Sequence, residues 1–272
     1  MPELPEVETT RRGLAPLVCG TTIAAVVVRN RALRKPIPRD LARNLTGRRI
    51  DALERRGKYL LFRAGDGTLI VHLGMSGRLR VVPANTAPET HDHLDLALAN
   101  GCIVRLRDPR RFGLVLWQTG DPLKHKLLRD IGPEPFSDAF SAEWLYRETR
   151  ARSGALKNAL MDSHLIAGVG NIYANEALFR AGINPKQPAR RIGLARYAVI
   201  VDKLRETLAE AIAAGGSSLR DYVNSEGKAG YFQDRFLVYG RADQPCFTCG
   251  TPIRGLVLGQ RSTFYCPLCQ RR

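Results

Sequence analysis

The first six residues of the chain, Met1 to Glu6, place a potential amine nucleophile beside a carboxylate. Removal of Met1, which the small Pro2 favours, would leave the secondary amine of Pro2 next to Glu3. An α-amino group has a pKa of about 7.8 against about 10.4 for a lysine, so much more of it is neutral near pH 7. Its condensation with a sugar aldehyde gives a cationic iminium, which is an electron sink for elimination. The alternative is that these residues only open the first helix.

Four cysteines near the end of the chain form a second group of residues that could do chemistry. They form the pattern C-x2-C-x16-C-x2-C and are Cys246, Cys249, Cys266 and Cys269. This spacing is typical of a zinc centre, and zinc with four sulfur ligands has no open position, so we predict one structural Zn²⁺. Disulfides are the alternative, which a cytosolic chain disfavours. Cys19 and Cys102 lie in apolar stretches and are expected in the core.

The charge balance favours a polyanionic partner. The 272 residues include 42 Lys and Arg against 26 Asp and Glu, for a net charge of +16. Such an excess is typical of proteins that bind nucleic acid or an anionic membrane surface, although it can also serve solubility alone. The chain has no apolar run of about 18 residues and no signal-peptide pattern, so we expect a cytoplasmic protein without a membrane partner. Its length leaves room for more than one domain.

The elements that must position these groups follow from the hydrophobic pattern. A helix is expected over about 5–17, and short apolar runs separated by glycine turns then indicate strands. These runs cover 23–28, 50–54, 59–63, 69–73, 79–82, 94–98, 103–107 and 114–117. Asn100-Gly101 is a strong hairpin signal between two of them. Strands at this spacing predict a β-sandwich or barrel.

The pattern changes to a helical period beyond a linker-like stretch at 129–137. Helices are expected over 141–152, 155–161, 172–181 and 194–214. The last of these should bury one apolar face, made by Leu194, Tyr197, Ala198, Val201, Leu204, Leu208 and Ile212. Residues 219–236 are polar and punctuated by glycine, which indicates a mobile loop.

Several further residues could grip or distort a nucleic acid. Gly168-Val-Gly-Asn171 precedes a helix, where free N–H groups can bind a phosphate, although a simple interhelix turn is the alternative. Met75 lies between glycines, and Arg110 and Phe112 follow a strand. Exposed apolar side chains beside basic groups could wedge a duplex open, or they could be ordinary core residues.

Two basic side chains remain ambiguous from their surroundings alone. Lys58 follows Gly57 and could be a plain surface charge. Arg261 lies between the two cysteine pairs, where two short strands would form a hairpin and place it near the tip. Zinc would hold that hairpin rigid, although a free surface arginine is the alternative.

Taken together, these motifs resemble the formamidopyrimidine-DNA glycosylase family over residues 2–270. The motifs that carry the resemblance are Pro2–Thr9, His72–Gly77, Asp108–Gly113, Gly168–Tyr173 and the four-cysteine module. The resemblance implies an α+β, multidomain fold. It would have an N-terminal catalytic β-sandwich with a leading helix (1–132), a helical domain with a helix-two-turn-helix (133–236), and a zinc-finger β-hairpin (237–272).

The resemblance also implies an activity: excision of oxidised purines such as 8-oxoguanine and formamidopyrimidines, followed by cleavage of the abasic strand through β,δ-elimination. It assigns nucleophile to Pro2, general acid/base to Glu3, phosphate binding and β-elimination to Lys58, and phosphate grip and δ-elimination to Arg261. Residues implied to contact DNA are Met75, His91, Arg110, Phe112, Lys157 and Asn171. The segment 218–231 resembles one that closes over the damaged base. The partner is double-stranded DNA with oxidised bases or abasic sites, bound by a monomer.

Two alternatives to this assignment stay open at the level of sequence. An endonuclease VIII-like enzyme would use the same amine on oxidised pyrimidines. The Leu-Pro-Glu-Val start and the long loop at 219–236 favour the purine enzyme. A non-catalytic zinc-containing protein that recognises distorted DNA would share the charge and the cysteines but not need the amine.

Overall fold

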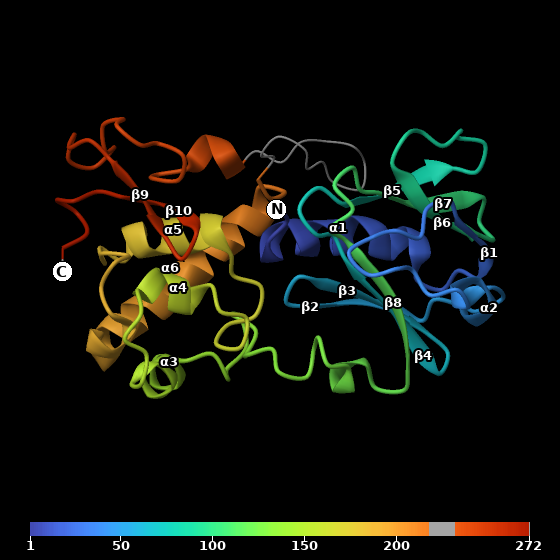
Figure 1. Cartoon of the computed structure of the whole chain (residues 1–272), viewed down its shortest axis with the longest axis horizontal. Coiled ribbons are helices and arrows are strands. Elements are labelled where there is room, and N and C mark those ends of the chain that lie inside the picture. Colours follow the sequence, from blue (N-terminus) through green and yellow to red (C-terminus); the bar gives the residue numbers. More distant parts are fainter. Residues whose placement is uncertain (218–231, 272) are drawn as a thin grey trace. The chain divides into compact units, whose positions relative to one another are not determined.

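The structure is a computed structural model that describes residues 1–217 and 232–271 (Figure 1). Within the described chain, contacts divide it into two compact units. The first comprises residues 1–129 and 214–217, and the second comprises 130–213 and 232–271. The helical region and the cysteine region therefore share the second unit.

The first unit contains two antiparallel four-stranded sheets. One has the order β1-β6-β7-β5 and the other β2-β3-β4-β8. The strands are β1 (Ile23–Val28), β2 (Ala52–Arg56), β3 (Tyr59–Ala64), β4 (Gly67–His72), β5 (Arg78–Pro83), β6 (Asp92–Leu98), β7 (Cys102–Arg107) and β8 (Leu114–Thr119). Asn100-Gly101 joins β6 to β7, with Gly101 at a φ of 82°. The turn needs this left-handed conformation, which glycine adopts without strain.

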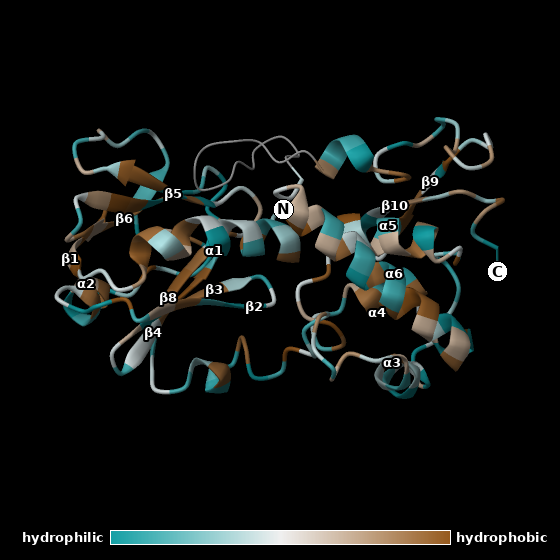
Figure 2. Cartoon of the chain, turned by 180° about the vertical axis from the view of Figure 1, so that it is seen from behind, coloured by the Kyte–Doolittle hydropathy of each residue, from teal (hydrophilic) through white to brown (hydrophobic). Residues whose placement is uncertain are grey.

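Both sheets and two helices contribute to one apolar core. Period-two alternation sends Leu94, Leu96 and Leu98 of β6 into it, while the intervening residues face outward. The apolar strands are brown in Figure 2. Helix α1 (Leu4–Val18) adds Val7 and Leu14, and the short helix α2 (Leu41–Leu45) adds its two terminal leucines. A short 3-10 turn, η1 (Pro122–Lys124), follows the last strand.

The second unit is built from helices and one hairpin. Its elements are α3 (Ala142–Thr149), α4 (Leu156–Leu160), α5 (Asn171–Arg180), η2 (Ala189–Arg191), α6 (Leu194–Ala213), η3 (Phe232–Arg235), β9 (Arg254–Leu258) and β10 (Arg261–Tyr265). Ser141 caps α3 by accepting the Trp144 N–H at 3.1 Å. Helix α6 packs against α3 and α5 through a face that includes Tyr197, Val201 and Leu204.

The expected fold class is confirmed: a leading helix, a β-sheet unit, a helical region and a terminal β-hairpin are all present. Several details differ. The second strand begins at Ala52, because Ile50 bonds with Thr21 instead of a sheet neighbour. Leu194 and Ala198 of α6 are exposed and do not belong to its buried face. Cys19 is exposed at the end of α1 and Cys102 is only half-buried, where we expected core residues. Within the described residues, none of the helices has the length and hydropathy needed to cross a bilayer.

Candidate catalytic and DNA-binding site

The N-terminal residues are held in place at the start of α1. Pro2 and Glu3 are buried, whereas Met1 is 40% exposed. Glu3 is the N-cap, and its backbone N–H donates to Glu6 Oε2 at 2.8 Å in a capping box. The opening motif therefore does start a helix, and the same contacts fix the position of Pro2.

Glu6 also binds a segment far along the chain. Its Oε1 accepts the Ser217 N–H at 2.8 Å and the Ser217 hydroxyl at 2.9 Å. Gly216 has a φ of 82°, and a Cβ there would lie 3.1 Å from Glu6 Oε1. Sequence reasoning missed Glu6 and Ser217 as positioning residues. The spacing of Glu3 and Glu6 is a capping-box signal, but Ser217 carried none.

Lys58 lies in the turn between β2 and β3. A cluster of charged side chains joins this turn to α1. Glu8 of α1 accepts hydrogen bonds from Arg11, Arg12 and Arg55. Arg55 in turn donates to the Gly57 carbonyl at 2.9 Å. Burial opposes ionisation of Glu8, but the arginines outweigh it and lower its pKa to about 2. The turn that carries Lys58 is thus attached to a carboxylate that stays charged at neutral and mildly acidic pH.

His72 is a neutral neighbour of Lys58. Burial, reinforced by the positive charges of Lys58 and Arg34, lowers the pKa of His72 to about 4. Its ring packs 4.7 Å from the ring of Tyr59 on the paired strand. The neutral ring accepts the Gly74 N–H at Nδ1, at 2.9 Å. It therefore anchors the start of the turn that carries Met75.

The turn with Met75 and the loop with Arg110 and Phe112 are bound to each other. Asp108, which is fully buried, accepts the Ser76 hydroxyl and the Gly113 N–H, each at 2.7 Å. The same hydroxyl accepts the Arg110 N–H at 3.1 Å. Gly74 packs so tightly here that a Cβ would lie 2.4 Å from the Phe112 carbonyl carbon.

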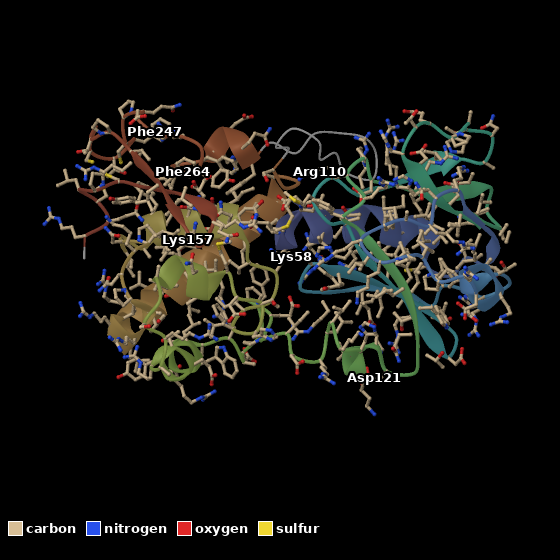
Figure 3. All side chains as sticks on the ribbon, in the orientation of Figure 1. Lys58, Arg110, Asp121, Lys157, Phe247 and Phe264 are labelled. Carbon is tan, nitrogen blue, oxygen red and sulfur yellow. The ribbon has the colours of Figure 1, made fainter. Side chains whose placement is uncertain are left out.

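The expected trio is therefore on two joined loops. Met75 is half-buried, Arg110 is exposed, and Phe112 is 44% exposed with the Arg110 guanidinium 5.0 Å from its ring. An exposed aromatic ring that stacks a guanidinium fits contact with nucleic-acid bases better than core packing. Figure 3 shows Arg110 and Lys58 on the first unit.

His91 lies at the end of the exposed loop before β6. Its φ of 73° is unusual for a residue with a side chain. The His91 carbonyl accepts the Asp108 N–H at 3.1 Å, which ties this loop to the base of the Arg110 loop. The ring is exposed and available to a ligand.

In the second unit, Lys157 and Asn171 bind each other and the β9–β10 hairpin. Figure 3 labels Lys157 and Phe264 of this hairpin. Lys157 is fully buried, and its ammonium donates to Asn171 Oδ1 at 2.8 Å, the Ser262 carbonyl at 3.1 Å and Thr263 Oγ1 at 2.6 Å. Asn171 Nδ2 also donates to the Ser262 carbonyl, at 3.0 Å. Arg261 is exposed at the tip of this hairpin, as predicted.

A buried carboxylate that sequence reasoning missed holds the chain leading into the hairpin. Glu176 of α5 accepts the backbone N–H groups of three successive residues, Leu237, Val238 and Tyr239, at 2.8–3.0 Å. Burial raises the pKa of Glu176, although these three donors and Arg180 oppose the rise. A lone Glu in a helix gave no sequence signal for this role.

The four cysteines fit one zinc ion. Their sulfur atoms all lie within 4.8 Å of one another, with Cys246–Cys269 at 4.0 Å and Cys249–Cys266 at 3.4 Å. Tetrahedral zinc with Zn–S bonds of about 2.3 Å separates its sulfurs by about 3.8 Å. These cysteines form a closed structural site that leaves no position for a substrate.

Comparison with known proteins identifies related chains over the full length. Family models match as formamidopyrimidine-DNA glycosylase N-terminal domain over residues 1–115, as the H2TH domain of that glycosylase over 131–223, and as a zinc finger found in FPG and IleRS over 243–272. Formamidopyrimidine-DNA glycosylases of Methylobacillus flagellatus and Aromatoleum aromaticum are each 55% identical. Both alignments cover 100% of this chain, with 97% and 100% of the relatives.

Solved structures agree with this similarity. The MutM (Fpg) protein of Thermus thermophilus superposes with a TM-score of 0.88 at 43% identity, covering 99% of this chain and 98% of that one. The Lactococcus lactis Fpg in complex with DNA containing an abasic site gives 0.91 at 35% identity, with 99% and 100% covered. The chain therefore belongs to the formamidopyrimidine-DNA glycosylase family.

Proposed function

We propose that this protein excises oxidised purines from double-stranded DNA and then cleaves the strand at the resulting abasic site. Family membership over the whole length supports this activity, and structures of Lactococcus lactis relatives contain DNA with Fapy-dG or an abasic site. The observation that carries the chemistry is the buried Pro2–Glu3 pair, fixed by Glu6 at the start of α1. Functional domains at 1–132, 133–236 and 237–272 remain part of the proposal.

The first chemical step uses the amine that removal of Met1 exposes. The Pro2 nitrogen lone pair attacks C1′ of the damaged nucleotide, and the base leaves with the electron pair of its glycosidic bond. The proton that the Pro2 nitrogen then loses neutralises the departing base. Glu3 donates a proton to the sugar ring oxygen as the C1′–O4′ bond breaks. The product is a cationic iminium between the Pro2 nitrogen and C1′, in an open-chain sugar.

Strand cleavage follows from the electron demand of that cation. Loss of a C2′ proton breaks the C3′–O bond and releases the 3′ phosphate, whose charge Lys58 would neutralise. A second elimination releases the 5′ phosphate, which Arg261 would hold. Water then hydrolyses the iminium and restores the Pro2 amine. Zinc supplies no step and only holds the hairpin.

The remaining residues would present the nucleotide to Pro2. The nucleotide must leave the base stack, and Met75, Arg110 and Phe112 would fill the gap. His91 and Asn171 would contact the backbone. Lys157 donates all three of its protons to protein oxygens, so we assign it a positioning role through Ser262 and Thr263.

The proposal places the protein in the bacterial cytoplasm as a monomer. The relatives named above are bacterial proteins, and the DNA that such an enzyme repairs is the chromosome.

Borohydride trapping with duplex DNA that contains 8-oxoguanine tests the nucleophile. We expect a covalent adduct, mapped by mass spectrometry to Pro2, from protein whose intact mass shows loss of Met1. The matched control inserts one alanine between Met1 and Pro2, which converts the proline amine to an amide.

The outcomes separate the alternatives. Trapping by the insertion variant at the wild-type level would show that Pro2 is not the nucleophile. Failure of the wild type to trap either 8-oxoguanine or abasic DNA would favour a non-catalytic DNA-binding protein. Release of oxidised pyrimidines in preference to 8-oxoguanine would favour the endonuclease VIII-like alternative.

A further inference from the structure

The outward face of the sheet β1-β6-β7-β5 carries an unusual concentration of arginine. Leu79 of β5 and Leu106 of β7 point into the core, so the alternating residues point outward. The register pairs these outward residues as arginine with arginine: Arg78 with Arg107, and Arg80 with Arg105. Like charges directly opposite on antiparallel strands destabilise a sheet.

One of these arginines, Arg105, has hydrogen-bond acceptors within the protein that account for its buried position. Arg105 is buried and binds both carboxylate oxygens of Asp95 at 2.8 Å. It also donates to the carbonyls of Thr86 and Ala87, at 3.0 Å each. Arg105 therefore has a structural role, because it closes the loop before β6 over the sheet.

The other three have only two carboxylates nearby. Glu89 forms an ion pair with Arg107, and Asp92, which attracts Arg78, also lies 3.7 Å from the Arg105 guanidinium. The Nε atoms of Arg78, Arg80 and Arg107 are buried without an acceptor among the described residues. Burial, together with the positive charges of Arg80 and Arg107, lowers the pKa of Arg78. We call Arg78, Arg80 and Arg107 the arginine trio.

The arginine trio is continuous with the loops assigned to DNA. Arg78 directly follows Gly77, the last residue of the Met75 turn, and Arg107 directly precedes Asp108, which begins the Arg110 loop. Arg107 also pairs with Asp92, the residue after His91. Residues two apart on a strand are separated by about 7 Å, so the trio could span neighbouring phosphates.

We propose that the arginine trio binds backbone phosphates of the DNA strand that the Met75 and Arg110 loops engage. This site rests on the proposed function and extends its DNA contact onto the strand ends beside the Met75 and Arg110 loops. The repulsion among these guanidinium groups, which is costly in the free protein, is offset when phosphate charge lies against their partly exposed side chains.

The salt dependence of binding tests the trio. Each phosphate contact contributes about 0.9 to the slope of log affinity against log salt, which is roughly eightfold in affinity at 0.1 M salt. For Arg78→Gln/Arg80→Gln we expect a slope shallower by about 1–2 on an uncleavable abasic-analogue duplex. The matched control is Arg39→Gln/Arg43→Gln, which makes the same charge change at exposed positions before and within α2.

The outcomes distinguish this site from the proposed activity and from a scaffold role. The Tm of Arg78→Gln/Arg80→Gln should equal or exceed that of the wild type, because repulsion between like charges is relieved. A slope equal to that of the control variant would overturn the phosphate site. So would a thermal shift by millimolar inorganic phosphate without a change in the DNA slope, which would indicate a free-anion site. A wild type that binds DNA but releases no base would contradict the proposed function instead.

Discussion

The two units hold their site residues in contrasting ways. In the first unit, three carboxylates each fix a different segment: Glu6 the N-terminus, Glu8 the Lys58 turn, and Asp108 the paired loops. In the second unit, Lys157, Asn171 and the zinc cysteines all act on one hairpin. Loss of one contact should therefore have local consequences in the first unit and release the whole hairpin in the second.

The size of the apolar cluster beneath each site helps to explain the contrast. The main apolar cluster of the first unit contains 22 buried residues, so its loops are attached to a large apolar framework. The cluster around the hairpin contains five, and two of these are the zinc ligands Cys246 and Cys266. A core this small needs a metal or buried polar contacts to define one structure.

Zinc removal should have the largest effect, because it should unfold the hairpin of the second unit and leave the first unit folded. In Cys266→Ser we expect loss of the metal and at least a hundredfold loss of strand cleavage, because structural zinc contributes on the order of 10 kcal/mol to such folds. The first unit should still melt cooperatively. Metal content, calorimetry and cleavage assays measure this, with Cys19→Ser as the control because Cys19 is exposed and outside the cluster. Full cleavage by metal-free protein would contradict the structural role of zinc.

Lys157→Met tests the hairpin without touching zinc. It leaves Asn171 Oδ1, the Ser262 carbonyl and Thr263 Oγ1 short of a charged donor, which should cost about 2–4 kcal/mol. We expect δ-elimination to fall more than base release, because Arg261 lies on this hairpin. Urea unfolding and product ratios on gels measure both effects.

The control for Lys157 is another lysine that contacts the same hairpin. Lys186 donates to the Tyr265 hydroxyl at 3.0 Å and is only half-buried. Lys186→Met should cost about 1 kcal/mol or less and keep the product ratio of the wild type. Equal losses in the two variants would show that burial of Lys157 has no special role.

Structural features that depend on neighbouring residues could be predicted from the sequence, whereas contacts between residues far apart in the chain could not. The strand alternation, the Asn100-Gly101 turn and the Ser141 cap each depend on a few neighbouring residues, and the structure has all three. Ser217 binds Glu6 across 211 positions. No local pattern reports such a contact, because it depends on how distant segments pack.

Lys157 shows the same limit for a site residue. Family resemblance marked it as a backbone contact, but its burial depends on Ser262 and Thr263, more than 100 residues away. The short helix α2 was missed because five residues are too few for a helical period. The expected closing segment at 218–231 lies outside the described residues.

One carboxylate in each unit, Glu8 and Glu176, should contribute to stability with opposite pH dependence. Glu8 has a folded pKa of about 2 against an ordinary value of 4.5. Its contribution is therefore present above about pH 4.5 and is lost as the pH falls toward 2. Glu176 has a raised pKa, so its contribution is present at pH values below its unfolded pKa and is lost as the pH rises through the folded value.

Charge-neutral variants measure these contributions separately. Glu8→Gln should lose about 2–3 kcal/mol at pH 7, allowing for partial exposure, and should show a flatter decline of stability between pH 5 and 2. Glu176→Gln should flatten the decline above pH 4.5 instead. Urea unfolding across this pH range gives both profiles, and identical profiles for the two variants would contradict the assignment.

The smallest expected effect tests whether the loops of the first unit are held independently. Ser76→Ala removes the hydroxyl that joins Asp108 to the Arg110 N–H, which should cost about 1 kcal/mol. The Gly113 N–H still binds Asp108, so the Arg110 loop should stay attached but become less well positioned. In the gap left by the flipped nucleotide, Arg110 would face the base opposite the lesion. We therefore expect weaker discrimination between bases opposite the lesion, with base release reduced less than threefold. Measurement of excision from the four opposite-base duplexes decides this, because a uniform loss would mean that Ser76 supports the whole unit.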